Sequence, residues 1–276
     1  MLVGIVGLGL IGGSFAKAYT KAGHQVLAMD IDESVLQYAI MSDIVEGELT
    51  TERLKECDLI LVCAYAGATI RFLEENGRYI GTKPIVIDCC GIKRIVVDRG
   101  MELAKEYGFT YAGGHPMAGT QYSGIKYSRA DMYVGAPMII IPPDYNDINL
   151  LDKIKKMLLP VGFDSITVTT AQKHDEMIAY TSQLAHIVSN AYIKSPTVRE
   201  HNGMSAGSYR DMTRVAWLSP EMWTELCMNN RDNLLKEIDI LFDNLQKYKE
   251  ALENEDSEEL KKLFLEGKKM KEEVDS

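Results

Sequence analysis

Residues 2–14 read LVGIVGLGLIGGS, and this stretch decides the fold. Residues 2–6 form a short apolar run typical of a buried strand, and Gly7, Gly9 and Gly12 follow it in the spacing G-x-G-x-x-G. A helical pattern then covers residues 10–22, and a second strand-like run over 25–29 ends at Asp30. A strand, a glycine turn, a helix and a second strand within about 30 residues predict a βαβ unit that binds a dinucleotide.

Steric and electrostatic reasons give each residue of this turn a role. Gly7 allows the tight turn, Gly9 lets a pyrophosphate approach the backbone, and Gly12 lets the helix pack against the strand. Leu10 and Ile11 open the helix, so their free N–H groups and the positive end of the helix dipole face the phosphates. The turn is therefore predicted to bind the cofactor phosphates.

Asp30 lies 18 residues after Gly12, at the end of the second strand. A carboxylate at this position accepts hydrogen bonds from ribose hydroxyls and repels a 2′-phosphate. The next residues, 31–33, include no arginine that would bind such a phosphate. We therefore expect NAD, and not NADP, as the cofactor.

Strand-like and helical runs alternate over the first 170 residues. Further strands are predicted at 59–63, 85–87, 109–112, 138–141 and 165–168, and helices at 33–41, 69–76 and 96–107. After residue 170 the pattern is only helical, with segments at 171–195, from 220 towards 249, and at 257–273. The predicted fold class is α/β: a Rossmann-like, mostly parallel sheet in residues 1–170, followed by an all-helical C-terminal domain in residues 171–276.

Composition limits the partners. A net charge of −10 over 276 residues gives no electrostatic reason to expect nucleic acid or an anionic membrane surface. No apolar run is long enough to span a bilayer, and the chain enters its first strand without an export leader. The five cysteines form no C-x-x-C pair, and three of them adjoin strand-like runs, as buried thiols do. We expect a cytoplasmic enzyme without a metal site.

Residues 113–120 read GGHPMAGT and follow the predicted strand 109–112. His115 is thereby placed at the carboxyl end of a strand, where open α/β sheets bind their ligands. Imidazole is well suited to accept a hydroxyl proton near neutral pH, as the oxidation of a carbinol requires. A histidine that only caps a turn is the alternative, and the dinucleotide fold favours a catalytic one.

Three blocks together resemble the prephenate dehydrogenase family: GLIGGS at 9–14, the 113–120 segment, and DMTR at 211–214 ahead of PEMW at 220–223. The resemblance covers essentially the whole catalytic unit. It implies NAD-dependent oxidative decarboxylation of prephenate, or of its transaminated relative arogenate, in tyrosine biosynthesis. It further implies that His115 takes or shares the proton of the ring hydroxyl.

The substrate is a dianion, so the enzyme must supply cationic partners for it. The candidate residues for this role lie mainly in the helical part. Arg214 matches the family's substrate-binding arginine, and Arg210, one turn earlier, adds a second charge. His186 corresponds to a family histidine near the ring, Gln183 lies beside it, and Thr120 ends the histidine segment. Solvated or salt-bridged helix faces are the competing interpretation of the arginines.

Small or polar residues recur at three- and four-residue steps along 171–195, at Asp175, Ala179, Ser182, His186 and Ser189. This stripe indicates either a wet cavity or polar packing between domains.

Two of the remaining histidines, His24 and His201, are interpreted as surface residues. For His174, near a helix start, an exposed position is the alternative to a place in the site.

The sequence departs from the family's pattern after the strand 85–87. The family carries a serine that hydrogen-bonds the catalytic histidine, and here Gly91 stands at that position, two residues before the aligned Lys93. A water, or a neighbour such as Ser123, is the expected substitute. Gln121 replaces a common acidic residue and reduces repulsion of the substrate carboxylates.

Two other functions remain open. A β-hydroxyacid dehydrogenase shares the domain order, but it usually relies on a lysine in the long helix, and Lys173 and Lys194 lie too near its ends. A catalytically silent NAD-binding protein is the other alternative, suggested by the missing serine. We also expect a homodimer formed through the helical part, because residues 221–245 and the terminal helix are amphipathic and the family dimerises there.

Overall fold

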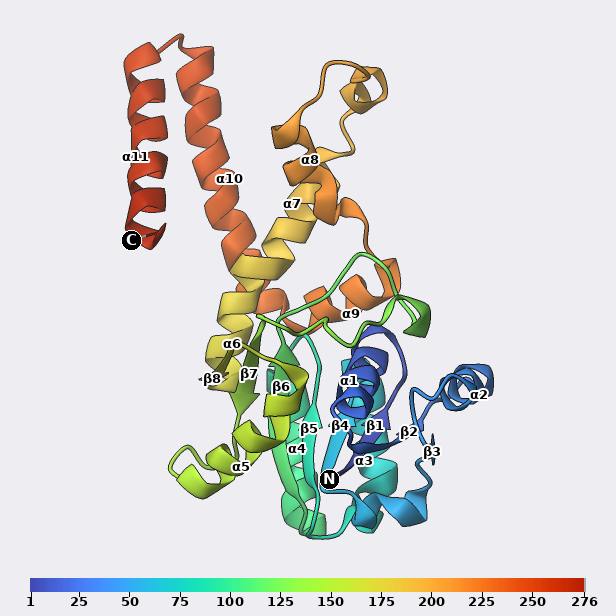
Figure 1. The fold of residues 1–276 in the computed structure, drawn as a ribbon. Coiled ribbons are helices and arrows are strands. Elements are labelled where there is room, and N and C mark those ends of the chain that lie inside the picture. The colour runs from blue at the N-terminus through green and yellow to red at the C-terminus, as the bar shows by residue number, and fades with distance from the viewer. Residues whose placement is uncertain (276) are drawn as a thin grey trace.

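A computed structural model describes residues 1–275 (Figure 1). One sheet of eight strands has the order β3-β2-β1-β4-β5-β6-β7-β8. Its strands are β1 (Leu2–Val6), β2 (Gln25–Met29), β3 (Gly47–Glu48), β4 (Leu59–Val62), β5 (Ile85–Asp88), β6 (Thr110–Pro116), β7 (Pro137–Ile141) and β8 (Ser165–Val168). The chain moves from β1 to β2 on one side and returns to β4 on the other, which creates the crevice where such sheets bind ligands.

Five α-helices cover the sheet on its two faces: α1 (Leu10–Lys21), α2 (Glu33–Met41), α3 (Ala66–Ile80), α4 (Arg94–Tyr107) and α5 (Ile148–Leu158). Two separate apolar cores result, because successive side chains of a strand point to opposite faces. Val3 and Ile5 of β1 join the core beneath α1, α2 and α5, whereas Val6 joins the core beneath α3 and α4. The predicted Rossmann-like class with a helical C-terminal part is confirmed.

β6 differs from its prediction in length and in pairing. It extends to Pro116 and pairs antiparallel with β7, with His115 opposite Ile139. All other strand pairs are parallel. His115 is therefore the penultimate residue of a strand and does not lie on a loop, so hydrogen bonds of the sheet fix its backbone.

The helical part begins with one long, continuous rod. It consists of α6 (Ala171–Ile178), a π-helical segment η4 (Ala179–Leu184) and α7 (Ala185–Tyr192), and it ends three residues before the predicted limit at 195. Further helices follow: α8 (Gly207–Thr213), the 3₁₀ turn η6 (Arg214–Ala216), α9 (Pro220–Asn229), α10 (Arg231–Glu253) and α11 (Ser257–Asp275). Within residues 1–275 no helix combines the length and apolar character that crossing a bilayer demands.

A single helix from 220 towards 249 was the expectation, and it is wrong. The helix breaks at Asn230, whose backbone is not helical (φ −124°, ψ 26°). The Asn230 side chain is fully buried and donates to the Asp175 carbonyl and to Oε1 of Gln183, both at 2.8 Å. These bonds offer an asparagine an alternative to continuing the helix, and they tie the α9–α10 junction to the long rod.

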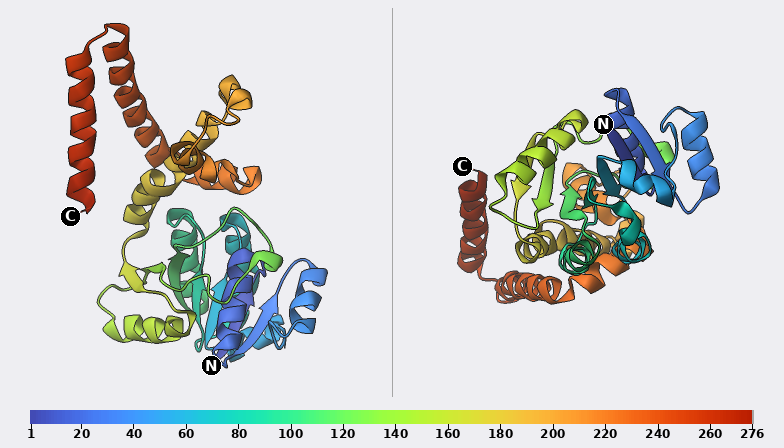
Figure 2. Two further views of the ribbon diagram at one scale, coloured as in Figure 1. Left: turned by 45° about the horizontal axis from the view of Figure 1, so that its top comes forward. Right: turned by 90° about the horizontal axis from the view of Figure 1, so that it is seen from below.

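α10 and α11 form an antiparallel pair that stands away from the sheet, and α7 and α8 form a second arm beside it (Figures 1 and 2). α11 packs on α10. Large apolar side chains remain exposed on this pair, among them Leu235, Phe242, Leu245 and Phe264.

Candidate functional site

The glycine turn has the geometry that its sequence predicts. Gly7 has a φ of +89°, and a Cβ there would lie 2.7 Å from the Cys63 carbonyl oxygen. A Cβ on Gly12 would lie 1.8 Å from the carbonyl oxygen of Gly7. By contrast, a Cβ on Gly9 would meet nothing within 4 Å. Gly7 and Gly12 are thus required by the fold, whereas Gly9 borders open space of the kind a pyrophosphate needs.

Free backbone donors lie at the same point. The α1 helix begins at Leu10 without a side-chain cap and without an acidic residue in its first turn. The Asp30 carboxylate accepts the Leu8 N–H at 2.6 Å and the Asp32 N–H at 2.9 Å, which fixes its orientation beside the turn. Each carboxylate oxygen retains a second acceptor site for ribose hydroxyls. These residues fit a dinucleotide.

His115 lies at the carboxyl edge of the sheet and belongs to a chain of hydrogen bonds. Its Nδ1 is 2.8 Å from Nε2 of His174, and Nδ1 of His174 is 2.7 Å from Oδ1 of Asp175. His115 is half-buried, while His174 and Asp175 are buried. β6 supplies the first residue of this chain and the start of α6 supplies the other two.

Asp175 anchors this chain as an ion. Although burial opposes ionisation, hydrogen bonds from His174 and from the backbone amides of Arg94 and Lys93 hold the pKa of the Asp175 carboxyl below its usual value. The Lys93 amide donates to Oδ1 at 2.7 Å and the Arg94 amide to Oδ2 at 2.9 Å. An ionised carboxylate only accepts hydrogen bonds, so the proton between it and His174 belongs to the imidazole.

The direction of the remaining bonds follows. His174 donates from Nδ1 to Asp175, so its Nε2 accepts from Nδ1–H of His115. His115 Nε2 is then the unprotonated nitrogen, and no group within residues 1–275 hydrogen-bonds to it. Burial above all, and then the neighbouring His174 and Lys93, lower the pKa of His115 well below its usual value. The result is a neutral imidazole with a free acceptor, which is the state a general base needs.

His174 is only 2% exposed, so the alternative of an exposed position is wrong. Its ring takes the orienting role for which a water or Ser123 was expected. At Gly91, where the family has serine, a Cβ would lie 3.2 Å from Cδ2 of Leu226, so α9 packs closely over this position.

His186 lies half-buried on α7 and stacks on Trp223 of α9, with ring centroids 3.8 Å apart and an interplanar angle of 28°. Its Nδ1 is 2.9 Å from the Ser182 carbonyl oxygen, so Nδ1 donates and Nε2 is free to accept. Burial first, and then the charge of Arg214, lower the pKa of His186. α7 packs against η6, which begins with Arg214, so the structure brings His186 and Arg214 together.

The other expected substrate residues are placed differently. Arg210 lies exposed on α8, one turn before the exposed Arg214. Thr120 is exposed in the segment after β6, and its hydroxyl accepts the Tyr122 N–H at 3.3 Å. Gln183 is buried, and its amide donates to the Leu226 carbonyl at 3.0 Å while accepting from Asn230. Both ends of the Gln183 amide are hydrogen-bonded to the α9–α10 region, so Gln183 holds the rod against these helices.

The Ser189 hydroxyl is buried one helical turn beyond His186 and has no hydrogen-bond partner within residues 1–275.

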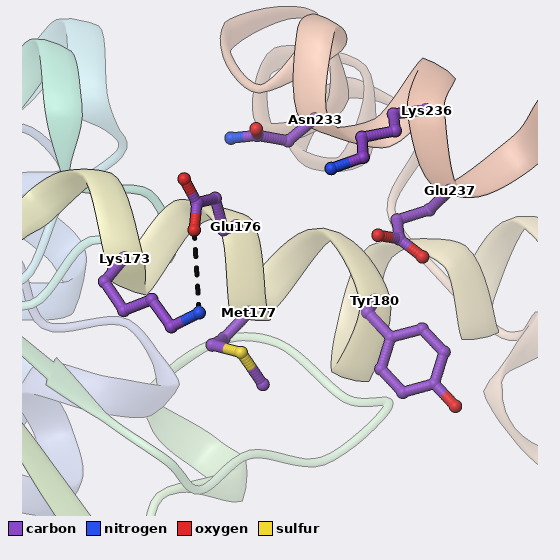
Figure 3. Close-up of a pocket in the computed structure, with 7 residues that line it drawn as sticks. All are labelled: Lys173, Glu176, Met177, Tyr180, Asn233, Lys236 and Glu237. Atoms are coloured by element: carbon purple, nitrogen blue, oxygen red, sulfur yellow. Dashed lines mark ion pairs between the residues drawn. The ribbon is translucent and has the colours of Figure 1, made fainter.

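A groove of about 290 Å³ lies between the rod and α10 (Figure 3). It is lined by Lys173, Glu176, Met177, Tyr180, Asn233, Lys236 and Glu237, and it contains none of the predicted site residues. Lys173 and Glu176 form an ion pair of 3.6 Å there, with both side chains exposed. Lys173 thus takes part in a surface pair and not in a catalytic cluster.

Comparison with known proteins follows the division seen in the fold. Residues 15–167 match the family model "Prephenate dehydrogenase, nucleotide-binding domain", and residues 170–266 match "Prephenate dehydrogenase, dimerization domain". A prephenate dehydrogenase of Bacillus subtilis (strain 168) is 26% identical over 270 residues, which span 94% of this chain and 72% of that protein.

Two solved structures are similar over almost their full length. Synechocystis arogenate dehydrogenase has a TM-score of 0.82 and 26% identity, covering 99% of this chain and 100% of that chain. Prephenate dehydrogenase from A. aeolicus, in complex with hydroxyphenyl propionate and NAD⁺, has a TM-score of 0.83 and 26% identity, covering 99% of this chain and 98% of that chain.

These matches, together with the glycine turn, identify an oxidoreductase that uses NAD. The two family models disfavour a β-hydroxyacid dehydrogenase. Lys173, which forms a surface ion pair, is not placed as a catalytic lysine of that class. Because the two models cover both halves of the chain in order, the chain belongs to the prephenate dehydrogenase family.

Proposed function

We propose that this protein catalyses the NAD-dependent oxidative decarboxylation of prephenate to 4-hydroxyphenylpyruvate, a step of tyrosine biosynthesis. The observation that carries the proposal is the chain His115–His174–Asp175, which leaves Nε2 of His115 unprotonated and free at the carboxyl edge of the sheet. Oxidation of a ring carbinol needs such an acceptor next to a dinucleotide site.

His115 moves one proton in this reaction and ends unchanged. As hydride leaves the carbinol carbon, Nε2 accepts the hydroxyl proton, and His174 and Asp175 stabilise the charged imidazole. The bond to the ring carboxylate then breaks and CO₂ departs. Its electron pair makes the ring aromatic, and the proton returns to the oxygen, which becomes a phenol. A general base in this role contributes roughly 10²–10⁴-fold to the rate.

The cofactor residues are assigned as in the sequence analysis. Gly7, Gly9 and Gly12 shape the turn, the N–H groups of Leu10 and Ile11 bind the phosphates, and Asp30 binds the adenine ribose. NAD supplies the hydride acceptor when it is bound.

The substrate carboxylates are assigned to the helical domain. Arg214 binds one carboxylate through its planar guanidinium, and Arg210 adds a second positive charge one turn away. His186, held against Trp223, offers a face and a nitrogen to the ring side of the substrate. Thr120 is assigned to the rim of the site. Gln183 is assigned a supporting role, because both ends of its amide are already hydrogen-bonded to other helices.

Arogenate is the second candidate substrate. Similarity to Synechocystis arogenate dehydrogenase supports it to the same degree as similarity to the A. aeolicus prephenate dehydrogenase, at 26% identity each. The two substrates differ only in the keto or amino group of the side chain, away from the atoms that react. A comparison of kcat/KM for the two compounds decides between them.

We also propose the division of labour and the assembly. Residues 1–170 bind NAD, and residues 171–276 bind the substrate and form a homodimer, in line with the match to a dimerization domain. The exposed apolar side chains of α10 and α11 suit burial against a second copy. The cytoplasm is the proposed location, since five free thiols suit a reducing compartment.

The test is formation of NADH from prephenate by the purified protein, followed by the same assay on His115→Asn. We expect a loss of kcat of roughly 10²–10⁴-fold in the variant, with NAD binding retained. His24→Asn, at the turn before β2, is the matched control and should keep wild-type activity. Binding of NAD without turnover of prephenate or arogenate would instead identify a silent NAD-binding protein.

A further inference from the structure

Lys93 is a lysine whose side chain is fully buried, with an exposed fraction of 0%. Its ammonium forms an ion pair with the Asp88 carboxylate, which is also fully buried, and donates to the Gly114 carbonyl oxygen at 2.5 Å. Taking two charges out of water is costly, and a buried ion pair is often no more stable than apolar residues of the same size. Stability alone therefore gives no clear reason for this pair.

The pair holds the residue that precedes the proposed base. Oδ2 of Asp88 accepts the Gly114 N–H at 3.3 Å and the Tyr111 hydroxyl at 2.7 Å. Both the N–H and the carbonyl of Gly114 are thus bound by one buried ion pair. The ion pair of Lys93 and Asp88 therefore fixes the backbone directly before His115.

Lys93 also reaches His115 by a second route. Its backbone N–H donates to Oδ1 of Asp175 at 2.7 Å, and the same oxygen receives Nδ1–H of His174. One residue therefore contacts both the backbone before His115 and the carboxylate that orients its ring.

We propose that Lys93 is a positioning residue for the reaction proposed above: it fixes His115 through Gly114 and through Asp175. Burial is the main effect that keeps the two histidines neutral, and the positive charge of Lys93 adds to it. Neutrality matters because only an unprotonated Nε2 accepts the hydroxyl proton. This inference rests on the proposed function, since it assigns Lys93 to the support of that base.

The charges around Lys93 agree with this role. After burial and the neighbouring histidine, Lys93 is the next cause that lowers the pKa of His115, and it also lowers that of His174. Asp88 and Asp175 oppose it at His174, where burial is the largest effect.

The other titratable groups beside the ammonium are neutral, because burial raises the pKa of each well above its ordinary value; they are Cys89, Cys90 and Tyr111. Arg94 carries the remaining positive charge and is bound to Asp175 and Asp232.

The experiment compares the double variant Lys93→Met/Asp88→Asn with the wild type. Both members of the ion pair are removed together, so the variant leaves neither a buried ammonium nor a buried carboxylate without its partner. We expect kcat of the double variant to fall roughly tenfold to hundredfold with little change in KM for NAD, as misplacement of a base does. The acidic limb of kcat/KM against pH should lie at higher pH in the double variant than in the wild type, because Lys93 no longer lowers the pKa of His115.

Tyr111→Phe is the matched control. It removes one hydrogen bond to Asp88 in the same buried cluster and changes no charge. Its melting temperature should fall, while its acidic limb should stay at the wild-type pH. A purely structural role of Lys93 predicts that the double variant behaves in the same way, and that result would overturn the proposal.

A wild-type measurement keeps the proposal testable if a variant does not fold. The ¹⁵N resonances of the imidazoles, followed against pH, should show His115 and His174 still neutral below pH 6.5, the ordinary value for histidine. Titration of His115 at or above the ordinary histidine pKa would reject the inference. Absence of turnover by the wild-type protein would reject the proposed function and leave this measurement intact.

Discussion

Nδ1 of His115 lies 2.8 Å from Nε2 of His174, although 59 residues separate the two in the sequence. The contact joins the sheet to the first turn of the helical part, since His115 lies near the end of β6 and His174 near the start of α6. It also fixes a direction: the ionised Asp175 makes His174 a donor on one side and an acceptor on the other. The proposed base is therefore defined by both domains.

His174→Ala removes the partner of His115 and leaves a cavity beside a buried carboxylate. We expect kcat to fall by about 10–100-fold, because the ring of His115 loses its orientation and its tautomer is no longer fixed. NAD binding should be unaffected, since the glycine turn follows β1, which lies three strands away from β6 in the sheet. His201→Ala, a histidine of the helical part outside this chain, is the control. A kcat of His174→Ala within twofold of wild type would contradict the assignment.

The sequence predicted local geometry in the site better than contacts between distant residues. The geometry of the glycine turn agrees with its prediction, down to the open space at Gly9, because a few consecutive residues determine it. His174 was missed because its contact is made between distant segments. The adjacent Asp175, in the polar stripe, was the available signal, since a buried carboxylate needs a donor nearby.

Tertiary contacts also decide where helices end. The helical pattern continues through Asn230, and the break there depends on hydrogen bonds to Asp175 and Gln183, which local propensity does not contain. The same bonds consume the Gln183 amide, so a residue expected at the substrate serves the packing of helices. The spacing of apolar residues in a helix shows which residues share a face, but it does not show which element that face contacts.

The pH dependence of both activity and stability follows from the neutral histidines. The folded-state pKa of His115 and of His174 is lowered, chiefly by burial, so the unfolded chain binds more protons. Stability is then fully present above the unfolded value near 6.5 and is lost as the pH falls below it towards the folded values. Activity should persist below pH 6.5 and fail only when Nε2 of His115 is protonated.

Thermal melts between pH 5 and 8 and kcat/KM over the same range check this prediction. The melting temperature should fall with acidity in the wild type and fall less steeply in His174→Ala, which has one neutral buried ring fewer. An acidic limb of kcat/KM above pH 6.5 would contradict the direction given for His115.

Gly9→Ala and Gly12→Ala separate binding from folding within one turn. Gly9 has an ordinary φ of −68° and free space for a methyl group, so Gly9→Ala should fold normally. Its NAD affinity should fall by about tenfold or more, or ~1.4 kcal/mol, because the methyl occupies the path of the pyrophosphate. Gly12→Ala meets the Gly7 carbonyl oxygen and should lose ~1–3 kcal/mol of stability. Calorimetric NAD titration and thermal melts of both proteins give the answer, and equal melting temperatures would refute it.

Asp30→Ala tests the choice of cofactor. The carboxylate is held beside the turn by the Leu8 and Asp32 amides. Its removal deletes the charge-assisted hydrogen bond that we propose it makes to the ribose. We expect KM for NAD to rise about tenfold or more, and the discrimination against NADP to shrink, because the repulsion of a 2′-phosphate disappears. Glu33→Ala, in the first turn of α2, is the control. Unchanged discrimination in Asp30→Ala would remove this residue from the cofactor site.

The apolar faces of α10 and α11 predict a dimer in solution. Leu235, Phe242 and Leu245 lie on α10 at intervals of seven and three residues, hence on one face, and each is at least half exposed. A face of this kind, on helices that stand away from the sheet, is rarely left in water. Sedimentation at micromolar concentration should give twice the 30.9 kDa mass of the chain, and Phe242→Glu should shift the protein towards the monomer. Asn244→Asp, an exposed polar position on the opposite face of the same helix, adds the same charge and should remain dimeric. A wild-type monomer at that concentration would mean that these side chains are solvated and that each active site is complete within a single chain.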